Sequence, residues 1–156
     1  MGVGKTTACQ ALKNSLPNAV FLDGDWCWDM HPFQVTDETK AMVMENICCL
    51  LNHFLACTAY DNVIFCWVMH EQGIIDEILS RLSLQDAEVH AVSLLCDEET
   101  LKARLMGDIA AGKRQMDVIP RSLARLAQYE RLNTVKMDVS RLTAEETAEQ
   151  LRQMAQ

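Results

Sequence analysis

The sequence predicts an α/β fold in which a parallel sheet is covered by helices on both faces. Along the 156 residues, short apolar segments of strand length alternate with segments of helical periodicity. The run at residues 63–68 is apolar without a break, which is typical of a strand covered on both faces. A glycine-rich turn at residues 2–7 stands directly before the first helical segment. Length and alternation together favour a single domain over residues 1–156.

The first two elements follow this turn. A helix is expected over residues 6–16, where apolar residues recur on one face and Pro17 ends the helix. A short buried strand is expected over residues 19–22, and Asp23-Gly24-Asp25 has the composition of the turn that closes it.

The middle of the chain continues the alternation. A long helix is expected from about residue 37 to residue 57, because apolar residues recur at helical spacing on its core side. The apolar run at 63–68 is expected to be the next strand, followed by a helix over 74–82 and a third strand over 89–95.

The next helices are recognised by their ends. Asp97 is expected to cap a helix that runs to Gly112, because acidic residues fill its first turn. Pro120 suits the first turn of a further helix that ends near Tyr129. Residues 107–120 between them are irregular and basic, so we expect them to form a mobile lid.

The last strand and helix close the domain. A fourth short strand is expected over residues 134–139. Thr143 and Glu146 have the spacing of a capping box, which predicts the start of the final helix.

Composition and charge exclude several classes of function. Apolar residues make up 49% of the chain and charged residues 23%, which is usual for a globular protein and excludes a disordered or fibrous one. A net charge of −8 would repel nucleic acid and anionic membranes, so we expect neither as a partner.

The seven cysteines form no C-x-x-C pair, and we expect reduced, buried thiols. With no apolar segment of membrane-spanning or signal-peptide length, the chain is expected in the cytoplasm, as a monomer or homodimer.

Residues 2–7 carry the most specific motif. Gly2-Val3-Gly4-Lys5-Thr6-Thr7 is the second half of a Walker A loop, G-x-x-x-x-G-K-[ST]. The glycines let successive backbone N–H groups point at one anion, and the helix that follows adds its N-terminal dipole. Lys5 would reach the β- and γ-phosphates of ATP, and the Thr6 hydroxyl would bind Mg²⁺.

The first glycine of this motif would stand two positions ahead of Met1, and the strand that normally leads into the loop would lie further upstream. We expect a start assigned late, at an internal methionine, with a genuinely shortened chain as the alternative. Without that strand, the strands at 63–68 and 89–95 would either pair with each other or leave their facing edges unpaired.

A pair of acids follows the second strand position of such a fold. Asp23 and Asp25 stand two residues apart at the carboxyl end of the strand over 19–22. One can hold Mg²⁺ through water, and the other can accept a proton from an attacking hydroxyl. The alternative is a solvated turn, which Asp-Gly-Asp also suits.

These residues together resemble a known family. Gly4-Lys5-Thr6-Thr7 followed by Phe21-Leu22-Asp23-Gly24-Asp25 resembles the P-loop small-molecule kinases, such as gluconate kinase, shikimate kinase, adenylylsulfate kinase and chloramphenicol phosphotransferase. The resemblance implies the three-layer α/β/α fold of P-loop NTPases, with sheet order 2-3-1-4-5 and strand 1 absent from this chain. It also implies ATP and Mg²⁺ as cofactors and a small-molecule acceptor. One departure is that Cys66 and Trp67 stand where relatives can carry a Walker B acid.

The resemblance and the motifs assign the following roles. Cofactor binding is expected from Gly2, Val3, Gly4, Lys5, Thr6, Thr7 and Arg104, and metal binding from Thr6 and Asp23. Catalysis is expected from Lys5, Asp25 and Arg114. Acceptor binding is expected from Asp25, Trp26, Trp28, His31, Arg121 and Arg125. The alternatives are that the tryptophans cover the sheet edge and that Arg121 and Arg125, at i,i+4 spacing, form a solvated basic stripe.

The sequence therefore predicts an ATP-dependent kinase that transfers a γ-phosphoryl group to a hydroxyl or phosphate of a small molecule. The alternative is a degenerate kinase that binds nucleotides without transferring phosphate. A GTPase is disfavoured, because Val135 stands where a guanine-reading Asn or Thr would be needed before Lys136 and Asp138.

Overall fold

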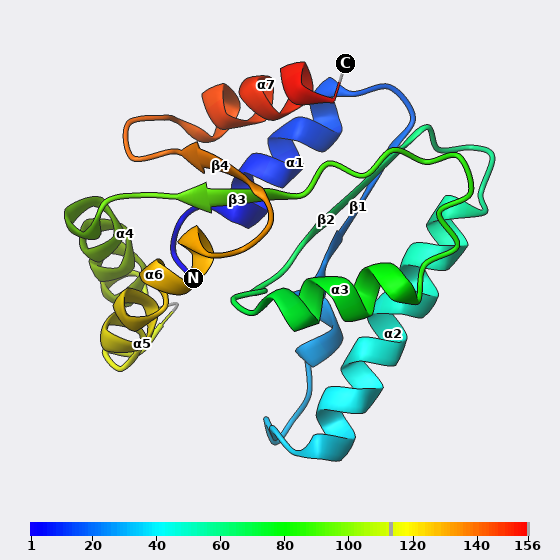
Figure 1. The fold of residues 1–156 in the computed structure, drawn as a ribbon. Coiled ribbons are helices and arrows are strands. Elements are labelled where there is room, and N and C mark those ends of the chain that lie inside the picture. The colour runs from blue at the N-terminus through cyan, green and yellow to red at the C-terminus, as the bar shows by residue number, and fades with distance from the viewer. Residues whose placement is uncertain (113, 156) are drawn as a thin grey trace.

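The computed structural model describes residues 1–112 and 114–155 (Figure 1). Helices and strands alternate along the chain as the sequence predicts. In order, the elements are α1 (Lys5–Ser15), β1 (Ala19–Asp23), the 3₁₀ helix η1 (Gly24–Trp28), α2 (Asp37–Leu55), β2 (Asn62–Cys66), α3 (Gln72–Ser80), β3 (Val92–Leu95), α4 (Glu98–Ala110), α5 (Val118–Ala124), α6 (Leu126–Glu130), β4 (Val135–Asp138) and α7 (Ala144–Met154).

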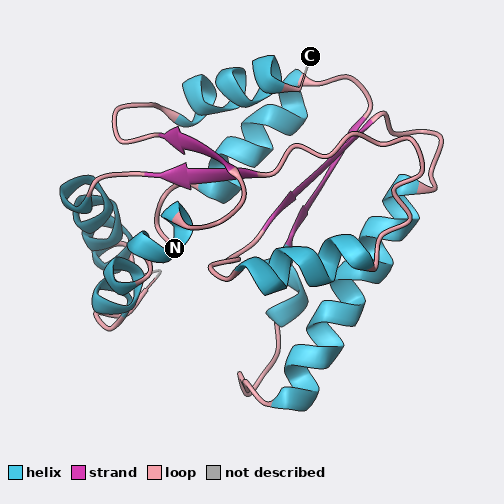
Figure 2. Cartoon of the chain, in the orientation of Figure 1, coloured by secondary structure: helices cyan, strands magenta, loops and turns pink. Residues whose placement is uncertain are grey.

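The strands form two parallel pairs, which Figure 2 shows in magenta. β1 pairs with β2, with Asp23 opposite Cys66 at the carboxyl end, and β3 pairs with β4. Across residues 1–112 and 114–155 no ladder joins β2 to β3. These are the pairings 2-3 and 4-5 of the expected order, and the predicted α/β fold is confirmed. Of the two outcomes expected for the strands at 63–68 and 89–95, the structure has the unpaired one.

The pair β1–β2 is covered by helices on both faces. Neighbouring residues of β1 point to opposite sides. Leu22 is buried against α2 and α3, and Phe21 is buried against α1 and α7. Figure 1 shows α1 and α7 together on one side of the molecule and α2 and α3 on the other. A separate apolar cluster lies between β4, α4 and α5, with Leu105 at full burial.

Two strands are shorter than expected. β2 ends at Cys66, so Trp67 and Val68 lie beyond the ladder although the apolar run includes them. β3 begins at Val92, and Val89, which we expected inside it, is 45% exposed. An apolar run reports burial and β propensity, and it does not mark where backbone pairing stops.

The helix expected after Pro120 is divided into two. α5 ends at Ala124 and α6 begins at Leu126, with Arg125 between them. The Arg125 N–H is bonded to the Ser122 carbonyl three residues back, which tightens the turn between the two helices. Arg121 and Arg125 therefore do not share one continuous helix, and this corrects the prediction.

The predicted helix caps are confirmed. The Asp97 carboxylate accepts a 2.7 Å hydrogen bond from the Thr100 N–H at the start of α4. At α7, the Thr143 hydroxyl accepts from the Glu146 N–H, and the Glu146 carboxylate accepts from the Thr143 N–H, which completes the capping box.

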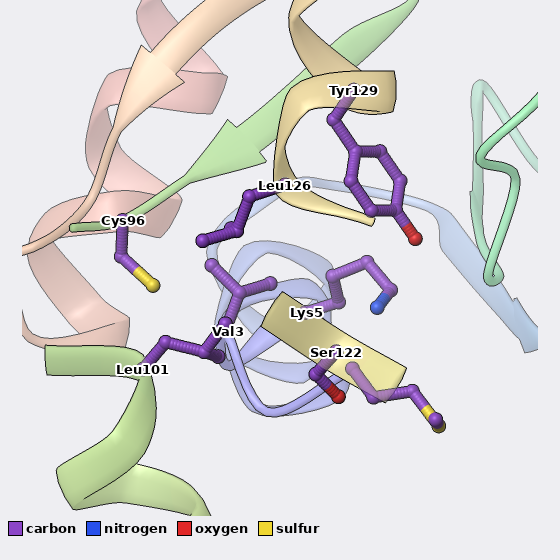
Figure 3. Close-up of a pocket in the computed structure, with 8 residues that line it drawn as sticks. Val3, Lys5, Cys96, Leu101, Ser122, Leu126 and Tyr129 are labelled. Atoms are coloured by element: carbon purple, nitrogen blue, oxygen red, sulfur yellow. The ribbon is translucent and has the colours of Figure 1, made fainter. Parts of the chain in front are cut away.

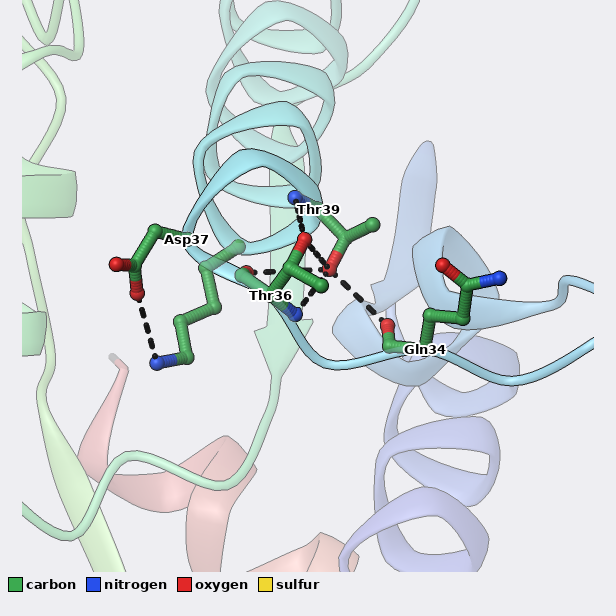
Figure 4. Close-up of polar contacts among 5 residues, drawn as sticks. Gln34, Thr36, Asp37 and Thr39 are labelled. Carbon is green, nitrogen blue, oxygen red and sulfur yellow. Dashed lines mark hydrogen bonds and ion pairs between the residues drawn. The ribbon is translucent and has the colours of Figure 1, made fainter.

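A second capping box, which the sequence did not reveal, starts α2 (Figure 4). The Thr36 hydroxyl accepts from the Thr39 N–H at 3.1 Å, and the Thr39 hydroxyl accepts from the Thr36 N–H at 2.8 Å. Threonine takes the place that Glu or Gln usually holds three residues after the cap, which hides this motif from a sequence search.

The cysteines do not all follow the prediction. All seven are free, and Cys9, Cys48, Cys66 and Cys96 are buried as expected. Cys49 and Cys57, however, are exposed, which corrects the expectation of buried thiols. Within the described part of the chain, no helix combines the length and the apolar character needed to cross a bilayer.

Candidate active site

The turn before α1 has the backbone shape of a phosphate-binding loop. Gly2 and Gly4 both adopt positive φ angles, 79° and 99°, which favour glycine. A Cβ atom on Gly2 would lie 2.5 Å from Leu105 Cδ2, whereas a Cβ atom on Gly4 would meet nothing within 4 Å. The Gly2 side of the loop is thus packed against α4, and the Gly4 side is open. α1 begins at Lys5, so the first N–H groups of the helix, which lack intrahelical partners, face this open side.

This open side leads into a pocket of about 480 Å³, a volume in the usual range for small ligands. Most of the residues that the sequence assigned to nucleotide, metal and catalysis line it. They are Gly2, Gly4, Lys5, Thr6, Thr7, Asp23, Asp25, Arg104 and Arg114. The loop, the end of β1 and the end of α4 therefore meet in one place, although they are far apart in the sequence.

Asp23 connects the phosphate loop to Asp25, the second acid of the pair. Its side chain is buried, with 4% exposure, and both carboxylate oxygens are bonded. The Thr6 hydroxyl donates to Oδ2 at 2.6 Å, and the Asp25 N–H donates to Oδ1 at 3.0 Å. The carboxylate is thereby fixed between the start of α1 and the turn that carries Asp25.

The Thr6 and Asp23 oxygens fit one side of a magnesium site. Mg²⁺ binds oxygen at about 2.0–2.1 Å in octahedral geometry and usually takes one or two protein ligands, with phosphates and waters completing the shell. Two oxygens 2.6 Å apart need to separate only slightly to occupy neighbouring positions of such a shell. No cluster of three or more His, Cys, Asp or Glu ligands exists among the described residues, and a magnesium site of this kind does not need one.

Asp25 is exposed to the pocket and has an altered acidity. Desolvation of its carboxyl group raises the pKa, and the neighbouring Asp23 carboxylate raises it further, whereas Lys5 and Arg114 act in the opposite direction. A carboxylate with a raised pKa is a stronger base than an ordinary aspartate, so this group suits proton abstraction from a hydroxyl.

The two arginines of the pocket have different partners. Arg104 donates to three backbone carbonyls, those of Val3, Val139 and Leu142, and so fastens α4 to the loop and to the end of β4. Arg114 Nε donates to Asp108 Oδ2 at 3.0 Å. Both arginines line a pocket in which a nucleotide would bring negative charge, and their predicted roles stay predictions.

A smaller cavity of about 30 Å³ lies on the other side of Lys5, under α5 and α6 (Figure 3). Val3, the remaining loop residue, lines this cavity rather than the larger pocket. The Ser122 and Tyr129 hydroxyl groups are buried without a hydrogen-bond partner among the described residues. The volume suits about one or two water molecules, which would satisfy both hydroxyl groups.

Apart from Asp25, the residues expected to bind the acceptor lie outside the lining of the large pocket. Trp26 is 52% exposed and packs edge-to-face on Phe21, and Trp28 packs on Phe33 and against the α2 core. His31 is exposed, as is Arg121, which pairs with Asp117 at 2.8 Å. Arg125 lies at the α5–α6 junction. Of that predicted group only Asp25 reaches the pocket, so the acceptor roles of the others stay predictions.

The predicted lid near residues 107–120 spans the end of α4 and the start of α5, and its residue 113 lies outside the described residues.

Trp67 is one of the pocket residues that sequence reasoning missed, and Val68 is another. Trp67 follows the last residue of β2 and lines the pocket together with Val68. The sequence placed it inside an apolar strand, where it would be buried. No sequence signal indicated this position: the residue after β2 comes next to Gly24 only through the register in which β1 pairs with β2.

Comparisons with known proteins agree with this fold. The AAA domain family AAA_18 matches residues 1–119. The structure of the Deinococcus radiodurans tunicamycin resistance protein superposes with a TM-score of 0.72 at 19% identity, covering 98% of this chain and 89% of that one. An unliganded sugar kinase from Janibacter sp. HTCC2649 superposes with a TM-score of 0.64 at 19% identity, covering 97% of this chain and 87% of that one. Structural similarity at 19% sequence identity shows that the chain shares its fold with these proteins. No curated protein sequence matches the chain.

Proposed function

The chain belongs to the AAA_18 family of P-loop kinase-like AAA domains, and on this basis we propose that it transfers the γ-phosphoryl group of ATP to a hydroxyl or phosphate of a small molecule. The family also confirms the resemblance to P-loop kinases drawn from the sequence. The observation that carries the proposal is the chain of contacts from Thr6 to Asp23 to Asp25, which joins the phosphate loop to an exposed acid.

The nucleotide side of this proposal rests on the loop and α1. The N–H groups at the start of α1 and the Lys5 ammonium offer donors to the β- and γ-phosphates. Lys5 has no ion pair within residues 1–112 and 114–155, so its charge is available to a ligand. Mg²⁺, held by Thr6 and Asp23, would neutralise charge that builds up on the transferred group.

The acceptor side rests on Asp25. Its carboxylate would accept the proton of the acceptor hydroxyl while the hydroxyl oxygen forms a bond to the γ-phosphorus. The bond from the γ-phosphorus to the bridging oxygen of ADP breaks, and ADP leaves with that electron pair. Arg114, which lines the pocket, would stabilise the charge on the equatorial oxygens in this step. A fixed orientation of Asp25 matters here, because misplacement of a reacting group by 1 Å can cost about 10²-fold in rate.

The experiment that tests the proposal measures binding and transfer separately. Binding of ADP and ATP, with and without Mg²⁺, is followed by titration calorimetry, and transfer is followed with γ-³²P-ATP and a mixed pool of small-molecule acceptors. We expect Mg²⁺-dependent ATP binding and labelled product. Binding without any transfer, including to water, would favour the nucleotide-binding alternative, and absence of ATP binding would contradict the proposal altogether.

A further inference from the structure

The end of the large pocket next to Asp25 indicates the chemical class of the acceptor. We infer that the acceptor is an uncharged ring compound of the sugar type, which lies with one ring face on the Trp67 indole and presents a hydroxyl group to Asp25. This inference rests on the proposed phosphotransfer function.

The position of the Trp67 side chain is fixed by Gly24. A Cβ atom on Gly24 would lie 2.5 Å from Trp67 Cγ and 2.6 Å from Cδ1, so the indole crosses directly over the backbone of residue 24. Because Asp25 is the next residue, the indole is held beside the acid by local geometry. Trp67 also packs against the core formed by β1, α2 and α3, which restricts its rotation further. A rigid aromatic surface of this kind binds a ligand without a large loss of side-chain entropy.

Trp67 and Val68 form the apolar wall of the acceptor end. Apart from Met1, which lies next to the phosphate loop in the sequence, the rest of the lining consists of phosphate-loop residues, of carboxylate and guanidinium groups, and of Gly107. A molecule whose hydroxyl meets Asp25 therefore places its carbon skeleton against the indole. The C–H groups on one face of a sugar ring make many dispersion contacts with a flat aromatic surface, which an open-chain compound matches less well.

The distribution of charge argues against an anionic acceptor. Among the described residues that line the pocket, the cations are Lys5, Arg104 and Arg114. Lys5 stands at the phosphate loop, Arg104 is bonded to three carbonyl oxygens, and Arg114 is paired with Asp108. The acceptor end itself carries the Asp25 carboxyl group, and Lys5 and Arg114 lie near enough to lower its pKa. Because Arg114 is already paired with Asp108 and Lys5 stands at the phosphate loop, a carboxylate or phosphate on the acceptor would meet Asp25 without an unengaged cation to offset it.

The test uses pairs of acceptors in which one member is uncharged and the other carries a carboxylate or phosphate, and transfer is scored at the hydroxyl groups that both members share. Glucose is compared with glucuronate, N-acetylglucosamine with N-acetylmuramate, and uridine with uridine monophosphate, in the transfer assay with Mg-ATP and the full chain. We expect the uncharged member of a pair to be phosphorylated with at least a tenfold higher kcat/KM. Preference for an anionic member, or transfer to none of the uncharged members, would overturn the inference.

A substitution then tests Trp67 itself. Trp67→Leu should raise the KM of the best acceptor at least fivefold and lower kcat less, because it removes contact with the bound ring rather than with the reacting atoms. Trp67→Phe should restore most of the affinity. Tyr60→Leu, an exposed aromatic before the other end of β2, is the matched control and should leave the acceptor KM unchanged. An unchanged KM in Trp67→Leu would overturn the assignment of this side chain.

Failure of the inference can be told apart from failure of the proposed function. ATP binding is measured before any acceptor is added, so its absence removes the proposed function and the inference with it. Transfer to an anionic acceptor, or transfer that is insensitive to Trp67, leaves the kinase function standing and removes only the inference.

Discussion

The Thr6 hydroxyl donates a 2.6 Å hydrogen bond to Asp23 Oδ2, and this contact joins the first turn of α1 to the carboxyl end of β1. Asp23 is almost completely buried, and this bond and the one from the Asp25 N–H supply partners for both of its carboxylate oxygens. The same contact therefore serves two purposes: it stabilises the junction of two elements, and it holds two oxygens in a position that suits Mg²⁺.

Thr6→Val removes the hydroxyl group and keeps the shape of the side chain. Asp23 Oδ2 then loses its partner, and we expect the free energy of unfolding to fall by about 1–3 kcal/mol in the absence of nucleotide. Thr6→Ser should retain most of the stability. Thr7→Val is the matched control, because the Thr7 side chain is exposed, and urea unfolding should show little change for it. Equal stability of Thr6→Val and wild type would show that the bond contributes nothing.

Lys5→Ala should abolish productive binding of Mg-ATP and leave the fold intact. Lys5 lines the pocket at the proposed phosphate site and makes no ion pair with the described residues, so its loss should remove ligand contacts without breaking an ion pair of the fold. Calorimetric titration with Mg-ATP measures the affinity, and circular dichroism checks the fold. Lys13→Ala, in the last turn of the same helix, serves as control. Normal turnover in Lys5→Ala would contradict the assignment of the loop.

Much of the fold could be predicted from the sequence, because it depends on local signals. Apolar Phe21 and Leu22 mark a strand buried on both faces, and Asp97 marks a helix start through a hydrogen bond three residues away. The phosphate loop is also local, since its chemistry lies in consecutive residues. These predictions hold wherever the chain supplies both partners of an interaction within a few residues.

The composition of the acceptor end could not be predicted in the same way. Trp26 and Trp28 follow Asp25 in the sequence, but they pack on Phe21 and Phe33 and line no part of the pocket. Trp67 lines the pocket because Gly24, some forty residues earlier, leaves room for its indole. Such a contact depends on the pairing of β1 with β2, and hence on tertiary structure. The sequence contains both residues but gives no signal that they meet.

Asp25→Asn is expected to reduce phosphotransfer by about 10²-fold or more while nucleotide affinity changes little, because general base catalysis contributes about 10²–10⁴-fold. Rates under single-turnover conditions with Mg-ATP measure the effect. Asp29→Asn, just after η1, is the control, because Asp29 is exposed and does not line the pocket. An unchanged rate in Asp25→Asn would exclude this carboxylate as the base.

The same substitution should make the folded chain more stable at neutral pH. The pKa of Asp25 is raised in the folded state by desolvation and by the Asp23 carboxylate, so on raising the pH the unfolded chain loses this proton first. The contribution of Asp25 to stability is therefore fully present below its unfolded pKa and is lost as the pH rises through the folded pKa. At pH 7 the charged group opposes folding, and Asp25→Asn should melt at a higher temperature than wild type. The difference should shrink as the pH falls below the unfolded pKa, and thermal melts between pH 3 and pH 8 show whether it does.

The two glycines of the loop should respond differently to alanine. Both have positive φ, so each substitution should cost about 1–2 kcal/mol for the left-handed conformation. At Gly2 the new methyl group would also lie 2.5 Å from Leu105 Cδ2, and Leu105 is fully buried, so about 1–3 kcal/mol of overpacking should be added. At Gly4 no atom lies within 4 Å of the methyl position, which faces the proposed phosphate site. We therefore expect Gly2→Ala to melt at the lower temperature of the two variants, and Gly4→Ala to lose Mg-ATP affinity out of proportion to its loss of stability.

A double-mutant cycle isolates the steric part of this prediction. Leu105→Ala alone should destabilise the fold by about 2–5 kcal/mol through the cavity that it leaves. Combined with Gly2→Ala, it makes room for the new methyl group, so the double variant should be more stable than the sum of the single effects predicts. No such relief is expected for Leu105→Ala combined with Gly4→Ala, whose methyl position is remote from Leu105. Strict additivity in both cycles, measured by urea unfolding, would show that the loop and α4 are not in contact at Gly2, and the packed side of the phosphate loop would have to be placed elsewhere.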